Sequence, residues 1–206
     1  MSKTEAFVKY SDAYDEWFEK NSDLYEAELE AIRQLIPPSE IKGVEIGVGS
    51  GKFAIPLGIE IGVEPSEKMA IKARKQGIKV YPGIAEDLPF PDGRFDFVLM
   101  VTTICFVDDV IKSFREAFRV LKSGGCIIIG FVDKESDLGI HYAKIREESK
   151  FYKEATFFSA QEVLKYLEEA GFRHMRIKQT LIPGVSLKII LDGFGKGAFV
   201  AIRGLK

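Results

Sequence analysis

From Lys42 onward, short apolar runs alternate with helical stretches, and this alternation restricts the fold more than any other feature of the sequence. The apolar runs are GVEIG, GIEIGVE, GIKVYPG, RFDFVLMV and GGCIIIGFV, and the clearest helices between them span 66–75 and 109–121. Strands separated by helices predict βαβ units, which form a parallel sheet with helices on both faces. We therefore expect a doubly wound α/β fold.

The two ends of the chain add further elements to this sheet. Residues 3–36 are expected to form two helices that share one aromatic stripe. A later helix begins at Ser159, where Glu162 completes a capping box. The runs RHMRIKQTLI and KGAFVAIRG are predicted to close the sheet as a pair. Because there is no internal repeat or low-complexity linker, we expect residues 1–206 to form a single domain.

The segment 133–158 interrupts the alternation. It is polar and aromatic, and it lies between the fifth strand and the helix that begins at Ser159. We interpret it as an inserted cap segment over the edge of the sheet.

Composition excludes several classes of function. The net charge of −2 provides no positive field for nucleic acid or an anionic membrane. No apolar stretch approaches the roughly 20 residues that cross a bilayer, and the N-terminal segment does not resemble a secretory signal. Two cysteines in apolar runs and two histidines without metal-ligand spacing predict a cytoplasmic protein without a metal site.

Three glycines follow the first apolar run directly. Gly47, Gly49 and Gly51 lie where a turn lets the backbone approach a ligand without Cβ clashes. In an open parallel sheet, ligands bind outside the carboxyl ends of the strands. The spacing G-x-G-x-G differs from the G-x-G-x-x-G that holds a pyrophosphate on a helix N-terminus. The loop therefore favours a nucleotide-like ligand that has no diphosphate, although a plain strand-to-helix turn is the alternative.

Two carboxylates refine this interpretation. Glu45 precedes the glycines, and its negative charge suits a cationic ligand unless it pairs with a surface lysine. Glu64 ends the second apolar run, a placement that suits hydrogen bonds to a ribose diol, although it could also be a solvated carboxylate. S-adenosylmethionine has an adenosine ribose, a positive charge and no diphosphate, so it meets this description.

The segments VEIGVGSG, GVEPS, GIAEDLPFPDGRFDFVLM and FREAFRVLKSGG carry a family resemblance. Together they resemble class I S-adenosylmethionine-dependent methyltransferases, in particular the small bacterial type-11-like branch that is similar to the ubiquinone/menaquinone methyltransferases. The resemblance implies a Rossmann-like doubly wound seven-stranded sheet of order 3-2-1-4-5-7-6, with strand 7 antiparallel. It also implies that residues 1–36 form an N-terminal helical lid.

The resemblance further implies which residues bind the cofactor. Glu45 and the three glycines would line the methionine end, Glu64 would bind the ribose hydroxyls, and the residues from Ile84 would form the adenine-binding turn. Ile84 stands where the family usually has Asp, so the backbone of Ala85 or the carboxylate of Glu86 is expected to replace that contact. The predicted cofactor-binding residues are Glu45, Gly47, Gly49, Gly51, Glu64, Pro65, Ala85, Glu86, Met100, Val101 and Thr102.

Candidate residues for the acceptor lie in three segments. The aromatic stripe of the lid supplies Tyr10, Tyr14 and Trp17, although such a stripe also packs in a core. Phe106 follows the fourth strand where the family commonly has a pair of histidines, which excludes a histidine base at that position. The inserted segment adds His141 and Tyr142, with an ordinary surface histidine as the alternative for His141.

The sequence predicts methyl transfer from S-adenosylmethionine to a small-molecule acceptor, leaving S-adenosylhomocysteine. This in-line displacement depends mainly on positioning and on the exclusion of water, so we assign no catalytic residue. The acceptor is an amine or, equally, a phenol or quinol, because N- and O-methylation are both compatible with the sequence. The alternatives are a non-catalytic S-adenosylmethionine-binding sensor or scaffold and, less favoured, an NAD-dependent oxidoreductase.

Overall fold

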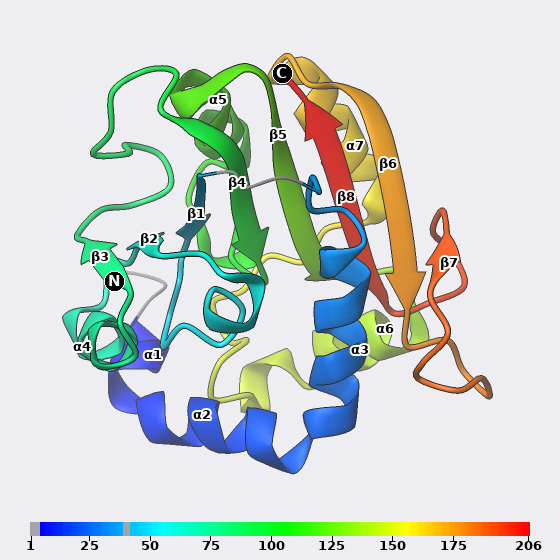
Figure 1. The fold of residues 1–206 in the computed structure, drawn as a ribbon. Helices are drawn as coiled ribbons and strands as arrows, with labels where there is room; N and C mark the ends of the chain where they lie inside the picture. The colour runs from blue at the N-terminus through cyan, green and yellow to red at the C-terminus, as the bar shows by residue number, and fades with distance from the viewer. Residues whose placement is uncertain (1–4, 39–41) are drawn as a thin grey trace.

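An eight-stranded mixed sheet forms the centre of the protein in this computed structural model, which describes residues 5–38 and 42–206 (Figure 1). The strands lie in the order β3-β2-β1-β4-β5-β8-β6-β7. Their bounds are Gly43–Ile46 for β1, Ile61–Val63 for β2, Lys79–Tyr81 for β3, Phe95–Val101 for β4, Leu121–Val132 for β5, Arg173–Thr180 for β6, Leu191–Asp192 for β7 and Phe199–Leu205 for β8.

The strand order follows the expected 3-2-1-4-5-7-6 with one addition. Strands β1 to β5 are parallel, and β8, the last long strand, is antiparallel to both β5 and β6. The two-residue strand β7 raises the number of strands to eight, so the predicted number of seven strands is wrong. It pairs with the end of β6, where Lys178 forms an ion pair of 2.8 Å with Asp192. So short a strand has no hydrophobic alternation that a sequence could display.

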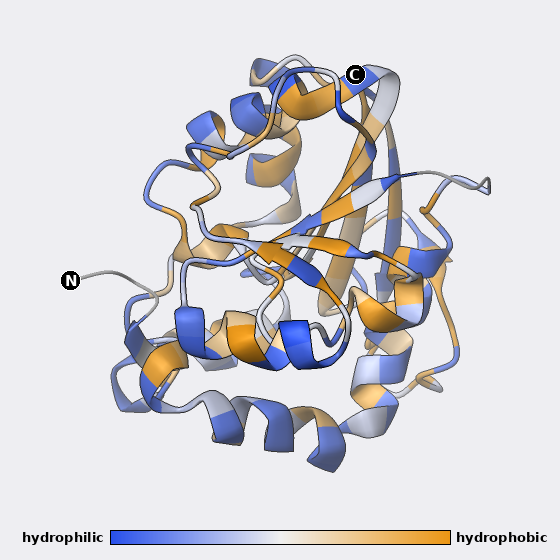
Figure 2. Cartoon of the chain, turned by 60° about the vertical axis from the view of Figure 1, so that its left-hand side comes forward, coloured by the Kyte–Doolittle hydropathy of each residue, from blue (hydrophilic) through white to orange (hydrophobic). Residues whose placement is uncertain are grey.

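Helices cover both faces of the sheet. On one face, α3 (Ser22–Arg33) and α4 (Glu67–Lys75) bury their apolar sides, and on the other α5 (Val110–Val120) and α7 (Ala160–Glu169) do the same. Figure 2 shows the central strands as mainly hydrophobic and the helices as mixed. The predicted helices 66–75 and 109–121 correspond to α4 and α5, and the Rossmann-like doubly wound fold is confirmed.

The N-terminal region contains three helices where the sequence predicts two. Both α1 (Glu5–Lys9) and α2 (Ser11–Lys20) precede α3, and the backbone leaves the helical region at Tyr10 and again at Asn21. The side-chain amide of Asn21 donates to the carbonyl oxygen of Trp17 at 2.8 Å, which helps end α2. The arrowheads of β4 and β5 point toward α1 and α2, which cross this edge of the sheet (Figure 1).

The segment 133–158 contains α6 (Asp137–Lys144) and the short 3₁₀ turn Arg146–Glu148. Its aromatic side chains reach the N-terminal helices, since the ring of Phe151 lies 5.7 Å from that of Phe7 and 6.2 Å from that of Tyr14. Two segments distant in the sequence therefore meet over the carboxyl ends of the strands. In the described part of the chain, no helix is long and apolar enough to cross a membrane.

The capping box of α7 gives a direct test of this local structure. The hydroxyl of Ser159 accepts the backbone N–H of Glu162 at 3.3 Å, and the Glu162 carboxylate accepts the N–H of Ser159 at 2.8 Å. We expect Ser159→Ala to lower the free energy of unfolding by about 1 kcal/mol, measured by urea denaturation. Ser22→Ala is the control because Asn21, and not Ser22, is the N-cap residue of α3. An equal loss in both variants contradicts the capping role.

Candidate active site

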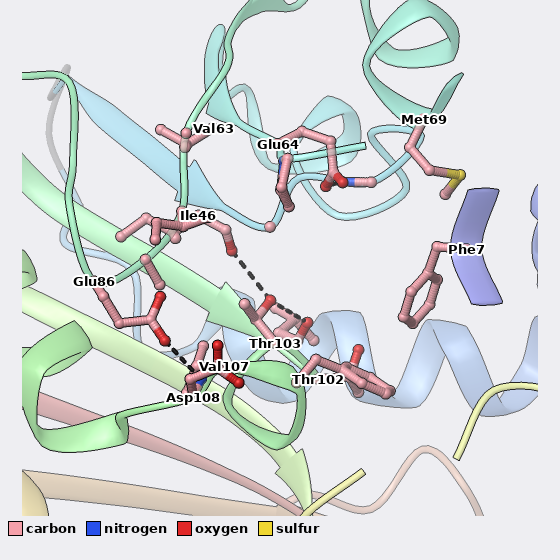
Figure 3. Close-up of a pocket in the computed structure, with 18 of the residues that line it drawn as sticks. Phe7, Ile46, Val63, Glu64, Met69, Glu86, Thr102, Thr103, Val107 and Asp108 are labelled. Atoms are coloured by element: carbon pink, nitrogen blue, oxygen red, sulfur yellow. Dashed lines mark hydrogen bonds between the residues drawn. The ribbon is translucent and has the colours of Figure 1, made fainter. Parts of the chain in front are cut away.

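A cavity opens at the carboxyl ends of β1, β2 and β4 (Figure 3). Its walls come from the loop after β1, the end of β2, the turn 83–86 and the segment 101–108 after β4. Phe7 of α1 and Tyr14 of α2 cover it. We call this space the first cavity, and it lies where open parallel sheets bind their ligands.

The loop after β1 packs directly against the segment after β4. The Thr103 hydroxyl lies 3.1 Å from the carbonyl oxygen of Ile46 and 3.0 Å from that of Val101, and it donates to these oxygens (Figure 3). Gly47 has a φ of +71°, and a Cβ there would lie only 2.6 Å from the side chain of Thr103. Glycine is therefore required at position 47 both by the backbone conformation and by the space.

The other two glycines of the loop have different surroundings. A Cβ at Gly51 would lie 2.6 Å from Cδ1 of Ile78, so this glycine allows core packing. A Cβ at Gly49 would meet only Met69 and Tyr14, at 3.6 Å or more, and Gly49 lines the first cavity. The loop continues into the short 3₁₀ turn Ile55–Leu57 and not into an α-helix. The helix N-terminus that holds a pyrophosphate in dinucleotide sites is consequently missing from this loop.

Glu64 is held in a fixed orientation at the end of β2. Its Oε2 accepts the N–H of Gly49 and its Oε1 accepts the N–H of Ser66, both at 2.9 Å. Burial raises the pKa of this carboxyl group, while the two N–H donors oppose that shift. Each oxygen retains acceptor capacity, and the residue lines the first cavity. Glu64 can therefore accept hydrogen bonds from two donors of a ligand.

Glu45 lies near the first cavity but does not line it. Its side chain is 2% exposed, and Oε2 is buried without a hydrogen-bond partner in the described structure. Burial raises the pKa of Glu45 well above its ordinary value, and a backbone bond from Ala54 opposes the shift only in part. Glu45 is thus a buried acidic group close to the glycine loop.

The turn after β3 connects two parts of the cavity wall. The carboxylate of Glu86 accepts the N–H groups of Asp108 and Asp109 at 2.6 and 3.2 Å, which joins the turn to the beginning of α5 (Figure 3). Ile84 is half exposed and lines the cavity together with Ala85. One carboxylate oxygen of Glu86 is thus engaged by backbone donors, while the backbone of Ala85 lies at the cavity surface.

The end of β4 and the residue after it contribute to the cavity, but the residue before them does not. Val101 and Thr102 line it, whereas Met100 is fully buried in the core cluster on the α5 side of the sheet. Thr102 has a φ of +50°, which is unusual for a β-branched residue, and its N–H donates to the carbonyl oxygen of Gly130 at 2.7 Å. Backbone strain of this kind clusters at functional sites.

A polar network holds α2 over the first cavity. The ammonium of Lys72, on α4, forms ion pairs of 2.7 Å with both Asp12 and Asp15. The hydroxyl of Ser50, in the glycine loop, donates to Asp15 at 2.5 Å. These contacts fix the position of α2, and with it the ring of Tyr14.

A second cavity adjoins the first. The two cavities share Phe7, Tyr14, Thr102 and Phe106. The lining of the second cavity is mostly aromatic, and it includes the carboxyl group of Glu28 from α3. Glu28 is 6% exposed, and burial raises its pKa to about 8. An ionisable group therefore stands in an otherwise largely apolar space.

The predicted acceptor residues lie in different places. Tyr14 and Phe106 line both cavities, and Trp17 and Tyr142 line the second. Tyr10 and His141 line neither: His141 is exposed, and Tyr10 packs against Phe151 with ring centres 6.1 Å apart. Of the predicted cofactor-binding residues, those outside the lining of the first cavity are Glu45, Gly51 and Met100.

Sequence reasoning missed several lining residues. Glu28 is four residues from both Leu24 and Ile32, so a charged residue on the apolar stripe of α3 was a signal that could have identified it. Phe7 belongs to the aromatic stripe of residues 3–36 but was not among the predicted site residues, and Thr103 directly follows the predicted Thr102 without a signal of its own. Phe151 and Tyr152 reach the second cavity through the path of the segment 133–158, which no periodicity in the sequence defines.

Comparison with known proteins identifies the family. A family model described as a methyltransferase domain matches residues 44–129. The crystal structure of an S-adenosylmethionine-dependent methyltransferase from Thermotoga maritima, described as a possible histamine N-methyltransferase, is 48% identical to this chain. The similarity covers 98% of this chain and 99% of that one, with a TM-score of 0.94. The chain belongs to the S-adenosylmethionine-dependent methyltransferases.

Two further relatives are consistent with this family. An uncharacterized protein of Methanocaldococcus jannaschii is 46% identical to the methyltransferase over 97% of this chain and 98% of its own length. A demethylmenaquinone methyltransferase of Staphylococcus aureus is 28% identical over 66% of this chain and 70% of its own length. Membership of the family confirms the resemblance seen in the sequence and implies S-adenosylmethionine as the cofactor.

The contact between Gly47 and Thr103 can be tested with a matched pair of variants of the methyltransferase. Gly47 and Gly58 have nearly the same φ, +71° and +69°, but a Cβ at Gly58 would meet nothing within 4 Å. We expect Gly58→Ala to cost about 1–2 kcal/mol through the backbone alone, and Gly47→Ala to cost about 1–3 kcal/mol more through overpacking. Thermal or urea unfolding measures both. Equal costs contradict the close contact.

Glu28 gives the stability of the methyltransferase a specific pH dependence. Below about pH 4.5, the ordinary pKa of a carboxyl group, Glu28 is uncharged in the folded and in the unfolded protein. Its raised pKa therefore does not lower the free energy of unfolding there. As the pH rises, Glu28 ionises in the unfolded protein first, and this lowers the free energy of unfolding. The loss is complete above about pH 8. We therefore expect Glu28→Gln to unfold like the wild type near pH 4 and to be more stable, by on the order of a few kcal/mol, at pH 9.

Glu26→Gln is the control for this measurement because Glu26 is exposed on the same helix. Its stability difference from the wild type is expected to stay small at every pH. A Glu28→Gln variant whose difference from the wild type does not grow between pH 4 and pH 9 rules out the uncompensated burial of Glu28.

Proposed function

We propose that this methyltransferase binds S-adenosylmethionine in the first cavity and transfers its methyl group to a small-molecule acceptor. The observation that carries the proposal is the orientation of Glu64. Its two oxygens are each fixed by one backbone N–H at 2.9 Å, and it lines the cavity beside Gly49. A carboxylate held in this way is suited to a ribose diol.

The chemistry of the first cavity fits this cofactor. Its described lining contains the acidic residues Glu64, Glu86 and Asp108 and no lysine or arginine. Such a lining favours a cationic ligand over a pyrophosphate. The glycine loop leaves room for a ligand at Gly49 and has no helix N-terminus behind it. These features support S-adenosylmethionine and disfavour an NAD-dependent oxidoreductase.

Individual roles follow from position. Glu64 would bind the ribose, Gly47 and Gly49 the methionine end, and Pro65 and Ala85 would flank the adenine. Val101 and Thr102 would lie beneath the sulfur at the end of β4. Glu45, Gly51 and Met100 would affect cofactor binding without lining the first cavity. Glu86 would do so through the turn that it joins to α5.

The protein's own contribution to the reaction is alignment and the exclusion of water. When bound, S-adenosylmethionine supplies a methyl group that is already activated on a positively charged sulfur. The rings of Phe7, Tyr14 and Phe106 separate the junction of the two cavities from solvent and orient what lies there. Burial raises the pKa of the Tyr14 hydroxyl and of the Tyr152 hydroxyl, so both keep their protons and do not act as bases.

The acceptor is proposed to be a small molecule that enters beneath residues 5–25 and 135–158. Relatives point to both acceptor classes, since one is described as a possible histamine N-methyltransferase and another is a demethylmenaquinone methyltransferase. The net charge of −2 disfavours nucleic acid. Transfer of a radioactive methyl group to any pool of small acceptors distinguishes the enzyme from a sensor that only binds the cofactor.

The ribose assignment is tested with Glu64→Gln. An amide cannot accept the N–H bonds of both Gly49 and Ser66, and it loses the charge, so we expect S-adenosylhomocysteine to bind at least about tenfold more weakly. Calorimetric titration measures the affinity, with NAD titrated in parallel and no binding of NAD expected.

Glu67→Gln is the matched control, because this carboxylate lies three residues away on α4, is exposed and pairs with Arg74. Its affinity for S-adenosylhomocysteine is expected to equal that of the wild type. If Glu64→Gln binds as tightly as the wild type, Glu64 does not hold the ribose. Binding of NAD in place of S-adenosylhomocysteine rejects the cofactor itself.

A further inference from the structure

The second cavity has the form of a binding site for one particular kind of molecule. Aromatic rings make up most of its lining, and they come from α1, α2, the segment after β4 and the segment 133–158. In the lining that the structure describes, Glu28 is the only charged side chain. A largely aromatic space with a single carboxyl group resembles the sites that proteins use for cations.

The second cavity adjoins the first and shares part of its lining. Thr102 and Phe106 line both cavities at the end of β4, and Phe7 and Tyr14 line both from the opposite side. The rings of Phe7 and Phe106 meet edge to face at 4.8 Å. A molecule held in the second cavity therefore lies against residues that also line the proposed cofactor site.

Glu28 has no partner within the described protein. It forms no hydrogen bond or ion pair there, in contrast to Glu30 on the same helix, which pairs with Arg33 at 2.9 Å. Buried carboxyl groups are ordinarily hydrogen-bonded or paired, because an unpaired one costs free energy. Glu28 in turn contributes to raising the pKa of the neighbouring tyrosine hydroxyls, namely those of Tyr14, Tyr25, Tyr142 and Tyr152.

We propose that the second cavity binds the methyl acceptor and that the acceptor is an amine, whose cationic nitrogen pairs with the carboxylate of Glu28. This inference rests on the proposed function for the identity of the reaction. An ammonium group supplies the charge and the N–H donors that Glu28 lacks, and the surrounding rings attract the same charge through their faces. A phenol or quinol offers a hydrogen bond to Glu28 but no compensating charge.

Glu28 is a binding residue in this proposal. It lines the second cavity and not the first, so its carboxylate holds the ammonium group, which has no lone pair and is not itself methylated, while a separate uncharged atom of the acceptor lies near Thr102 and Phe106 to receive the methyl group. The burial that raises the pKa of Glu28 to about 8 has a measurable consequence. At pH 7 the empty site is mostly protonated, so the pairing of an ammonium with Glu28 releases a proton.

The experiment compares amines with alcohols of the same carbon skeleton. Benzylamine, phenethylamine and cyclohexylamine are each titrated beside the corresponding alcohol, into the whole protein saturated with S-adenosylhomocysteine. We expect at least one amine to bind at least tenfold more tightly than its alcohol. We expect close to one proton to be released at pH 7, measured by calorimetry in buffers of different ionisation enthalpy.

Variants then assign the effect to Glu28. Glu28→Gln is expected to remove both the preference for the amine and the proton release, while S-adenosylhomocysteine binds as in the wild type. Glu26→Gln, on the exposed side of α3, is expected to retain both. In the wild type, the amine should bind up to tenfold more weakly for each pH unit below 8.

Two results overturn the proposal: no amine binds more tightly than its alcohol, or Glu28→Gln keeps the preference. Either result with normal S-adenosylhomocysteine binding leaves the proposed function intact. The same titrations without S-adenosylhomocysteine test the case in which the amine site exists but the proposed cofactor site does not. An amine preference that depends on Glu28, in a protein that does not bind S-adenosylhomocysteine, supports the amine site and rejects the proposed cofactor site.

Discussion

The close approach of Gly47 to Thr103 sets the spacing between the loop after β1 and the segment after β4, and both cavities depend on that spacing. The Thr103 hydroxyl links the two segments through the carbonyl oxygen of Ile46, and the N–H of Gly49 then continues the link to Glu64, directly after β2. Three neighbouring strand ends are thus joined by hydrogen bonds at the floor of the first cavity. A site fixed to the sheet in this way holds its geometry without needing a ligand.

The cover of the cavities is held by weaker contacts than the floor. The α2 helix is attached to α4 and the glycine loop through Lys72 and Asp15, whose side chains are partly exposed, and partly exposed ion pairs contribute little to stability. Ring contacts between Phe151 and the N-terminal helices complete the cover. The floor of the cavities is therefore held by buried hydrogen bonds that involve the backbone, whereas the cover is held by side-chain contacts that are partly exposed to solvent.

Buried carboxyl groups around the cavities oppose the stability of the fold. Burial raises the pKa of Glu28, Glu45 and Glu64, but only Glu64 has both oxygens engaged by backbone donors. Apolar residues of similar size at positions 28 and 45 would remove this cost. The concentration of such groups beside two adjoining cavities is typical of a site arranged for ligands.

The sequence by itself determined the doubly wound sheet, the family and the approximate place of the first cavity. These depend on local patterns: the period of apolar residues, the capping box at Ser159 and the glycines that follow β1. The positions of Glu64 and Thr102 follow in the same way, because the carboxyl ends of parallel strands meet at one edge of the sheet.

Only the tertiary structure decided which of these residues reach the cavities. Glu45 and Met100 are on the same strands as lining residues, yet the packing of each strand directs their side chains away from the first cavity. The second cavity depends on segments far apart in the chain, such as α3 and residues 151–152, which line it together. Such an arrangement arises from packing and has no period in the sequence, and so the place of Glu28 in the lining of the second cavity emerged only when the helices were in place.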